Sequence, residues 1–153
     1  IGISRRRDAS VAAVAAAMTR RLGEGDRFCV FLEGTSTAGD RILPFRSPLV
    51  QPAVDAGVPV VPAAIRWSAG CPEIDIAEDV AYWKDHVFGP HAWRLLGLRT
   101  LRARIVFGEP IRAEGRDRKA LARDLEERIA ALTGLPRMKE RGDEGYSKER
   151  DGV

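Results

Sequence analysis

The sequence predicts an α/β fold with a mixed, largely parallel central sheet flanked by helices, and three observations support this prediction. Two apolar runs of strand length lie at Phe28–Leu32 and Val58–Ile65. Segments with helical periodicity, residues 11–22 and 116–132, alternate with strand-like segments. A near-continuous apolar run is typical of a strand covered on both faces, and alternating helices and strands favour parallel pairing.

The amino-terminal half is expected to run from a helix to the central strand and then, through a loop, to a second short helix. Ser10 suits the N-cap of the helix over residues 11–22. The central strand is Phe28–Leu32, within which Cys29 is expected to be a small buried hydrophobe. Pro48 suits the first position of the short helix that follows the loop.

The carboxyl-terminal half contains further elements and a tail. His91–Leu96 is expected to be a short amphipathic helix, and Leu101–Phe107 alternates as a half-exposed strand near an edge. The helix over residues 116–132 carries one apolar stripe. We therefore expect one domain over residues 1–135, followed by a disordered charged tail over residues 136–153.

Aromatic residues gather shortly before the predicted edge strand, around Tyr82, Trp83 and Trp93. Two uses are open for them. They can pack in the core, or they can form a membrane-interface patch beside basic residues, since Trp and Tyr favour that interface. Core packing is the favoured interpretation.

Composition excludes some classes of protein but does not identify a single one. The chain has 153 residues, 44% hydrophobic and 31% charged, as in a soluble globular domain. Its net charge of +3 suits anionic lipid head groups, phosphate substrates or nucleic acid, or simply a solvated mixed-charge surface. No stretch approaches the roughly 20 apolar residues of a membrane span. Two cysteines are too few for a disulfide framework, so a reducing, cytoplasmic setting is expected.

A polar loop directly follows the predicted central strand and holds the main candidate site. Glu33, Gly34 and Thr35 come at the carboxyl end of the strand, which is where open α/β sheets place their ligands. The chain becomes apolar again at Ile42–Phe45 and then reaches Arg46. An ordinary glycine-containing turn is the alternative interpretation of the same residues.

Two blocks of this region resemble the glycerolipid acyltransferases, the family of bacterial 1-acylglycerol-3-phosphate acyltransferase. The family's third block reads F-P-E-G-T-R-S followed by L-P-F-K/R, and it is matched here by Phe31, Glu33, Gly34, Thr35, Leu43, Pro44, Phe45 and Arg46. Leu32 replaces the family proline, and Ser36 replaces the family arginine. Gly57–Ile65 is similar to the fourth block, V-P-I-V-P-V-A-I.

The resemblance implies an O-acyltransferase that moves a fatty acyl group to a lysolipid hydroxyl of the lysophosphatidate type in phospholipid biosynthesis. Glu33 and Gly34 would shape the acceptor pocket, and Thr35 would contribute a hydroxyl contact. Arg46 and Arg5 (or its neighbour Arg6) would bind a phosphate. Because Ser36 replaces the family arginine, an acceptor without a phosphate is the alternative.

The family's catalytic H-x-x-x-x-D block has no match. His86 is followed five places later by His91, and His91 by Leu96, so neither histidine fits, and both are expected to be structural. Because the chain starts at Ile1 rather than Met, we expect an amino-terminally truncated fragment that is inactive alone. The alternative is a non-catalytic relative that binds a lipid or an anion.

The resemblance also implies the partners. The acyl donor would be acyl-CoA or acyl carrier protein, with no cofactor and no metal, and the protein would act at the cytoplasmic face of a membrane. Nucleic-acid binding would rest on the arginines alone, without a recognition motif or stacking platform, and is not expected. The oligomeric state is open.

Overall fold

The computed structural model describes residues 11–84 and 86–138 and has a mixed α/β architecture. Within these residues the elements, in chain order, are α1 (Val11–Gly23), a 3-10 turn η1 (Ser47–Leu49), α2 (Gln51–Asp55), β1 (Ala63–Ala69), a π-helical turn η2 (Ile76–Val80), α3 (Phe88–Leu96), β2 (Leu101–Phe107) and α4 (Arg118–Thr133).

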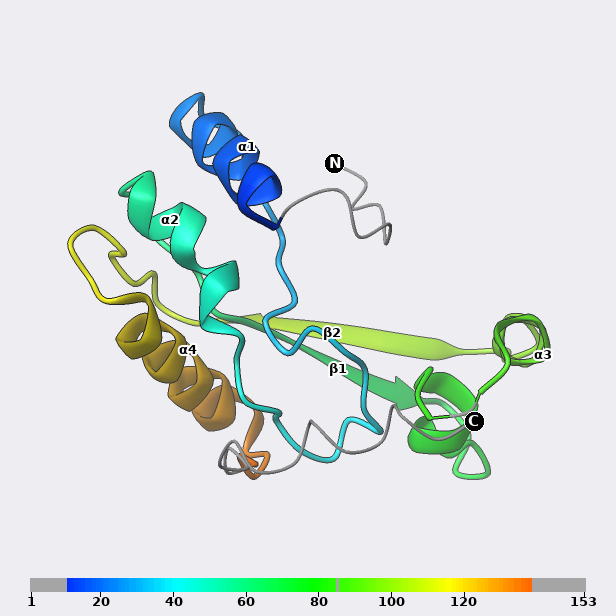
Figure 1. Cartoon of the computed structure of the whole chain (residues 1–153). Helices are drawn as coiled ribbons and strands as arrows, with labels where there is room; N and C mark the ends of the chain where they lie inside the picture. Colours follow the sequence, from blue (N-terminus) through cyan, green and yellow to red (C-terminus); the bar gives the residue numbers. More distant parts are fainter. Residues whose placement is uncertain (1–10, 85, 139–153) are drawn as a thin grey trace, which may run out of the picture.

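The two strands form an antiparallel sheet that runs through the middle of the molecule (Figure 1). Their register places Ala63 opposite Phe107 and Ala69 opposite Leu101. Helices α1, α2 and α4 gather at one end of the sheet, whereas α3 lies at the other end. The chain between β1 and β2 makes a long excursion that holds η2 and α3.

The predicted largely parallel central sheet is not what the described residues form. Phe28–Leu32 has no strand partner among them, and Phe31 is 71% exposed. Cys29, expected to be buried, is exposed as well. A strand needs a neighbouring ladder to bond its backbone, and here the Leu32 carbonyl accepts from the Arg46 N–H at 2.9 Å instead. Parallel pairing within the described residues is limited to an isolated bridge, Ile42 to Arg137.

The second predicted strand starts later than expected, at Ala63 rather than Val58. Pro59 and Pro62 lack the N–H that a continuous ladder requires, which explains the late start. Val60, between them, makes an isolated antiparallel bridge with Ile111.

The helix predictions are largely confirmed. Helix α1 ends one residue after its predicted end, at Gly23. Helix α4 is capped by the Asp117 carboxylate, which accepts from the Ala120 N–H at 2.8 Å, and it stops at Gly134 with a left-handed φ of 68°. Helix α3 begins at Phe88, three residues before the predicted His91.

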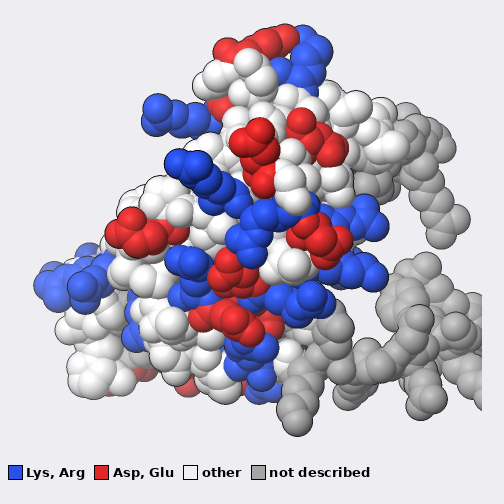
Figure 2. Space-filling view, turned by 90° about the vertical axis from the view of Figure 1, so that its left-hand side faces the viewer, with Lys and Arg blue, Asp and Glu red and all other residues white. Residues whose placement is uncertain are grey.

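The core lies at the α4 end of the sheet. Its buried members come from α4, from the end of η1 and from the segment after β2, and they are Val50, Ile111, Ala113, Leu121, Ala122 and Leu125. Outside this core the surface of the same end is strongly charged. Figure 2 shows Lys and Arg interleaved with Asp and Glu across this face.

The start of the predicted tail is attached to the loop that follows Phe28–Leu32. The Ile42 N–H donates to the Pro136 carbonyl at 3.0 Å, and the Met138 N–H donates to the Ile42 carbonyl at 2.8 Å. The rest of the predicted tail, residues 139–153, lies outside the described residues.

Candidate functional site

The loop over residues 33–46 is closed by its own polar groups. The Glu33 carboxylate accepts from the Leu43 N–H at 3.2 Å. The Arg46 Nε donates to the Glu33 carbonyl at 3.4 Å. Together with the backbone bond from Arg46 to Leu32, these contacts bring the two ends of the motif into one cluster.

Gly34 allows Arg46 to lie across this cluster. Gly34 has a left-handed φ of 68°, which side chains rarely adopt. A Cβ at this position would lie 2.6 Å from the Arg46 Nε. Glycine is therefore favoured here for two reasons: the backbone conformation is left-handed, and a side chain would displace the Arg46 guanidinium from its present position.

The Glu33 carboxylate has a raised pKa. Partial burial raises the pKa most, the nearby Glu126 charge raises it further, and the hydrogen bond from Leu43 opposes both. Glu33 therefore serves the loop, and its carboxylate is already engaged within it.

Glu126 on α4 holds the other side of the loop and was not foreseen from the sequence. Its Oε2 accepts from the Phe45 N–H at 3.2 Å, and its Oε1 pairs with the Arg137 Nε at 3.1 Å. Phe45 and Glu126 are 81 positions apart in the sequence. The helical periodicity around Glu126 therefore does not indicate that its side chain contacts the loop.

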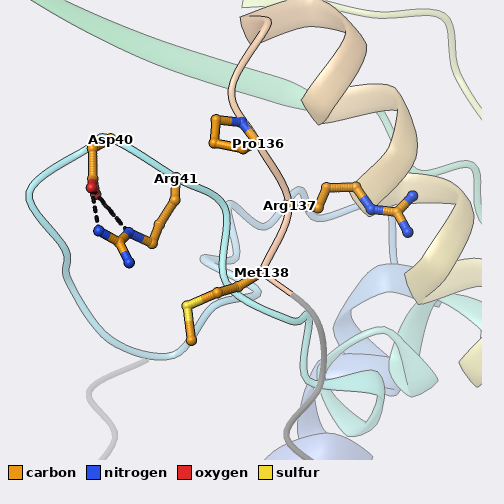
Figure 3. A pocket seen from close by; sticks show the side chains of 5 residues that line it. All are labelled: Asp40, Arg41, Pro136, Arg137 and Met138. Atoms are coloured by element: carbon orange, nitrogen blue, oxygen red, sulfur yellow. Dashed lines mark hydrogen bonds and ion pairs between the residues drawn. The ribbon is translucent and has the colours of Figure 1, made fainter.

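A small cavity of about 230 Å³ lies where the loop meets the segment after α4 (Figure 3). Asp40 and Arg41 pair with each other on one side of it. Arg137 points away from them toward α4, where it also pairs with Glu127 at 2.9 Å. The charged groups around this cavity are thus paired within the protein. We therefore interpret these contacts as holding the loop in place rather than as binding a ligand.

A larger groove of about 510 Å³ begins at the same loop. Its walls come from the loop, from β1 and the start of β2, from the segment that holds η2 and α3, and from the end of α4 and the residues after it. They consist of Ser36–Gly39, Ile65–Trp67, Ile76, Val80–Tyr82, Leu95, Leu101, Thr133 and Leu135. Most of these side chains are apolar. The groove can accommodate an apolar ligand with its polar end at the loop.

The structure brings together three of the five predicted site residues, Glu33, Gly34 and Arg46. Thr35 is exposed beside them, and Arg5 lies outside the described residues. Arg46 makes no ion pair with an acidic side chain in the described ranges, so its guanidinium has capacity for an anionic group. The groove residues on β1, such as Trp67, were missed because they become neighbours of the loop only through the fold.

The two histidines lie in an aromatic cluster on the β1–β2 excursion. The rings of His86 and His91 stack with centroids 5.3 Å apart, and Tyr82 lies 5.4 Å from His91. His86 Nε2 is 3.7 Å from a Glu78 carboxylate oxygen. This packing agrees with the structural role expected for both histidines. In the described part of the chain no group of side chains is arranged to hold a metal ion.

Comparison with known proteins gives a family model and two curated relatives. A family model described as Acyltransferase matches residues 1–66. The lyso-ornithine lipid O-acyltransferase of Brucella abortus is 33% identical over 126 residues, covering 75% of this chain and 47% of the relative. The enzyme of the same name from Pseudomonas aeruginosa is 31% identical over 113 residues, covering 73% of this chain and 42% of the relative. No solved structure gives a significant match.

The chain therefore belongs to the glycerolipid acyltransferase family, as the two motif blocks predicted. It spans just under half the length of the curated relatives that it matches. Among the described residues, no helix is both long enough and apolar enough to cross a bilayer.

Proposed function

We propose that this chain binds the lysolipid acceptor of an O-acyltransferase that moves a fatty acyl group from acyl-CoA or acyl carrier protein to a lysolipid hydroxyl. The observation that carries the proposal is the apolar groove of about 510 Å³ whose wall includes Ser36–Gly39 of the loop over residues 33–46 (the Glu33 loop). Glu33, Gly34, Thr35 and Arg46 belong to the same loop but do not line the groove. A lysolipid has one apolar chain and one polar head, and the groove with its adjacent loop matches that division.

The acceptor we propose is a lyso-ornithine lipid rather than a lysophosphatidate. Two features support this choice. Both curated relatives are named for that acceptor. In addition, Ser36, which stands where the family block has an arginine, lines the groove itself. The loss of a guanidinium at that point removes a phosphate ligand, whereas Arg46 remains for the carboxylate of an ornithine head group.

The chemical step needs a base, and the family's base, the histidine of the H-x-x-x-x-D block, has no match in this sequence. The acceptor oxygen attacks the thioester carbonyl, the carbon–sulfur bond breaks, and the hydroxyl proton must be taken up by a base. Neither His86 nor His91 fits the H-x-x-x-x-D spacing. We therefore assign acceptor binding to this chain and place the base outside these 153 residues.

The test is an acyl-transfer assay on the full-length gene product, with lyso-ornithine lipid and lysophosphatidate as competing acceptors. The parent is expected to prefer the ornithine lipid. Trp67→Ala, in the groove, should raise the acceptor KM by about tenfold because it removes buried apolar contact. Phe107→Ala is the matched control, since this aromatic side chain lies at the other end of the sheet, does not line the groove and is exposed.

Ser36→Arg sharpens the assignment of the acceptor. The new guanidinium should move the preference toward lysophosphatidate. A parent enzyme that prefers lysophosphatidate would refute the proposed acceptor. Binding of lysolipid without any turnover by the full-length product would instead support the alternative function, a non-catalytic lipid-binding relative.

A further inference from the structure

The β1–β2 excursion carries an exposed apolar surface at the end of the molecule opposite the core. Four large apolar residues on and just before α3 define this α3 surface: Val87, Phe88, Trp93 and Leu96. Trp93 and Leu96 are each 80% exposed, and Phe88 is 69% exposed. The sequence favoured core packing for Trp93, and the structure shows that this interpretation is wrong.

Within the described residues, the α3 surface is the outer side of the helix. Trp93 and Leu96 are three residues apart and therefore lie on the same side of α3. His91 is the buried residue of the helix, and it packs against the rings of Tyr82 and His86. The helix thus fills its inner side with a histidine and turns its largest apolar side chains to solvent.

Basic residues accompany the α3 surface. Between positions 84 and 104 the sequence holds five basic residues and one acidic residue. Of the basic ones, Arg94 pairs with Asp79 at 3.7 Å, whereas Lys84, Arg99, Arg102 and Arg104 form no ion pair with the described residues. The acidic residues of η2 are engaged locally; Asp75, for example, accepts from the Ala77 N–H at 2.8 Å.

We propose that the α3 surface docks on an anionic phospholipid bilayer. Trp, Phe and Leu on one face, with Lys and Arg beside them, is the pattern of a helix that lies in the membrane interface. Lys84 and Arg99 would contact the anionic head groups. The face at the opposite end of the molecule carries interleaved charges of both signs (Figure 2).

The position of the groove fits this docking mode. Leu95 lines the groove, while its neighbour Leu96 belongs to the α3 surface. Tyr82 also lines the groove and packs edge-on against Phe88, with ring centroids 5.9 Å apart. One segment therefore forms a wall of the groove and the docking surface, so that a lipid could pass from the bilayer to the groove without crossing water.

The experiment measures tryptophan fluorescence of the full-length gene product on vesicles of phosphatidylcholine and phosphatidylglycerol that contain brominated lipid. Bromine quenches only tryptophans that reach the acyl region. The parent should be quenched, and Trp93→Phe should be quenched measurably less, because Trp93 is 80% exposed on the α3 surface, whereas Trp67 is 48% exposed and Trp83 donates its ring N–H to the Ala77 carbonyl. No acyl donor is present, so this result is independent of the proposed enzymatic function.

A second measurement uses the double variant Trp93→Ser, Leu96→Ser and the control Phe107→Ser, which removes an aromatic residue that is 67% exposed at the far end of β2. The double variant should keep the parent's melting temperature and lower vesicle binding by about tenfold or more. Binding should also weaken with salt.

Two outcomes would overturn the proposal. One is equal quenching of the parent and Trp93→Phe, which would show that Trp93 does not enter the bilayer. The other is a parent dimer in light scattering that the double variant converts to monomer without any change in vesicle binding, which would assign the α3 surface to a second copy of the chain.

Discussion

The two ends of the β1–β2 sheet use their apolar residues in opposite ways. At the α4 end, Leu121 and Leu125 are fully buried against Val50 and Ile111. At the α3 end, the large apolar side chains of Trp93 and Leu96 are turned to solvent. The comparison places the buried core of the described fold at the α4 end, although Phe107 is exposed there too, and it shows that the apolar residues of α3 lie mainly on the surface.

The two ends also differ in how their charged groups are paired. On α4, Asp124 accepts from both Arg116 and Arg128, and these guanidinium groups lower the pKa of that carboxyl. Beside α3, Lys84 lies over the Trp83 ring at 3.8 Å from its centroid, and neither Lys84 nor Arg99 forms an ion pair within the described residues. Satisfied charges suit a solvated face, and unpaired cations suit an anionic partner.

The largest expected effect is the difference in free energy of unfolding between substituting a core leucine and substituting a surface leucine. Leu125→Ala should lower the free energy of unfolding by about 2–5 kcal/mol because it leaves a cavity in the core. Leu96→Ala should change it by less than about 0.5 kcal/mol because that side chain is already exposed. Urea denaturation followed by circular dichroism measures both. Equal losses for the two variants would contradict the placement of the buried core at the α4 end.

The next effect concerns the loop that lies between these two ends. Gly34→Ala should cost about 1–3 kcal/mol because the new Cβ meets the Arg46 guanidinium and the backbone is left-handed. Gly115→Ala is the matched control, with the same φ of 68° and no neighbour within 4 Å of its Cβ. The difference in free energy of unfolding between the two isolates the collision with Arg46. No difference would show that Arg46 moves aside freely.

The parts of this fold that the sequence predicted are those governed by local chemistry. The α4 periodicity, with Asp117 before it and Gly134 after it, specifies a helix without reference to the rest of the chain. The bounds of the strand Leu101–Phe107 were likewise evident from its alternation, but its burial does not alternate as predicted, since Ile105 and Phe107 on the apolar face are exposed. The Glu33 loop was identified through its family motif, and its internal contacts join residues only 10 to 13 positions apart.

The parts that were missed depend on partners distant in the sequence. Phe28–Leu32 has the composition of a strand, but composition does not supply a neighbouring strand. Glu126 reaches Phe45 across 81 positions, which no periodicity reveals. Trp93 lies on an amphipathic helix whose pattern is the same whether its apolar face meets a core or a membrane. Such a pattern indicates that one face of the helix is apolar, but what that face contacts depends on the rest of the fold.

A smaller effect is expected when the N-caps of α4 and η2, at the two ends of the molecule, are removed and compared. Asp117→Ala removes the cap of α4 and should lower the free energy of unfolding by about 0.5–2 kcal/mol. Asp75→Ala removes the equivalent cap of η2. Because the buried core lies at the α4 end, the second variant should speed amide hydrogen exchange in η2 while global unfolding changes less. An equal global loss from both caps would show that the two ends unfold as one unit.

The smallest expected effect is a pH dependence at Glu33. Burial raises the pKa of this carboxyl, so between its ordinary value of 4.5 and its raised value the folded protein binds the proton more tightly than the unfolded chain does. The ionised group therefore costs stability, and this cost appears as the pH rises through that window.

Glu33→Gln tests this sign, because the amide oxygen can still accept from the Leu43 N–H while carrying no charge near Glu126. The variant should be at least as stable as the parent at pH 7, and this advantage should disappear as the pH falls below 4.5. Glu109→Gln, at an exposed carboxyl, is the control. A variant that is equally less stable at both pH values would show that Leu43 needs the charged carboxylate and that this hydrogen bond outweighs the cost of burial.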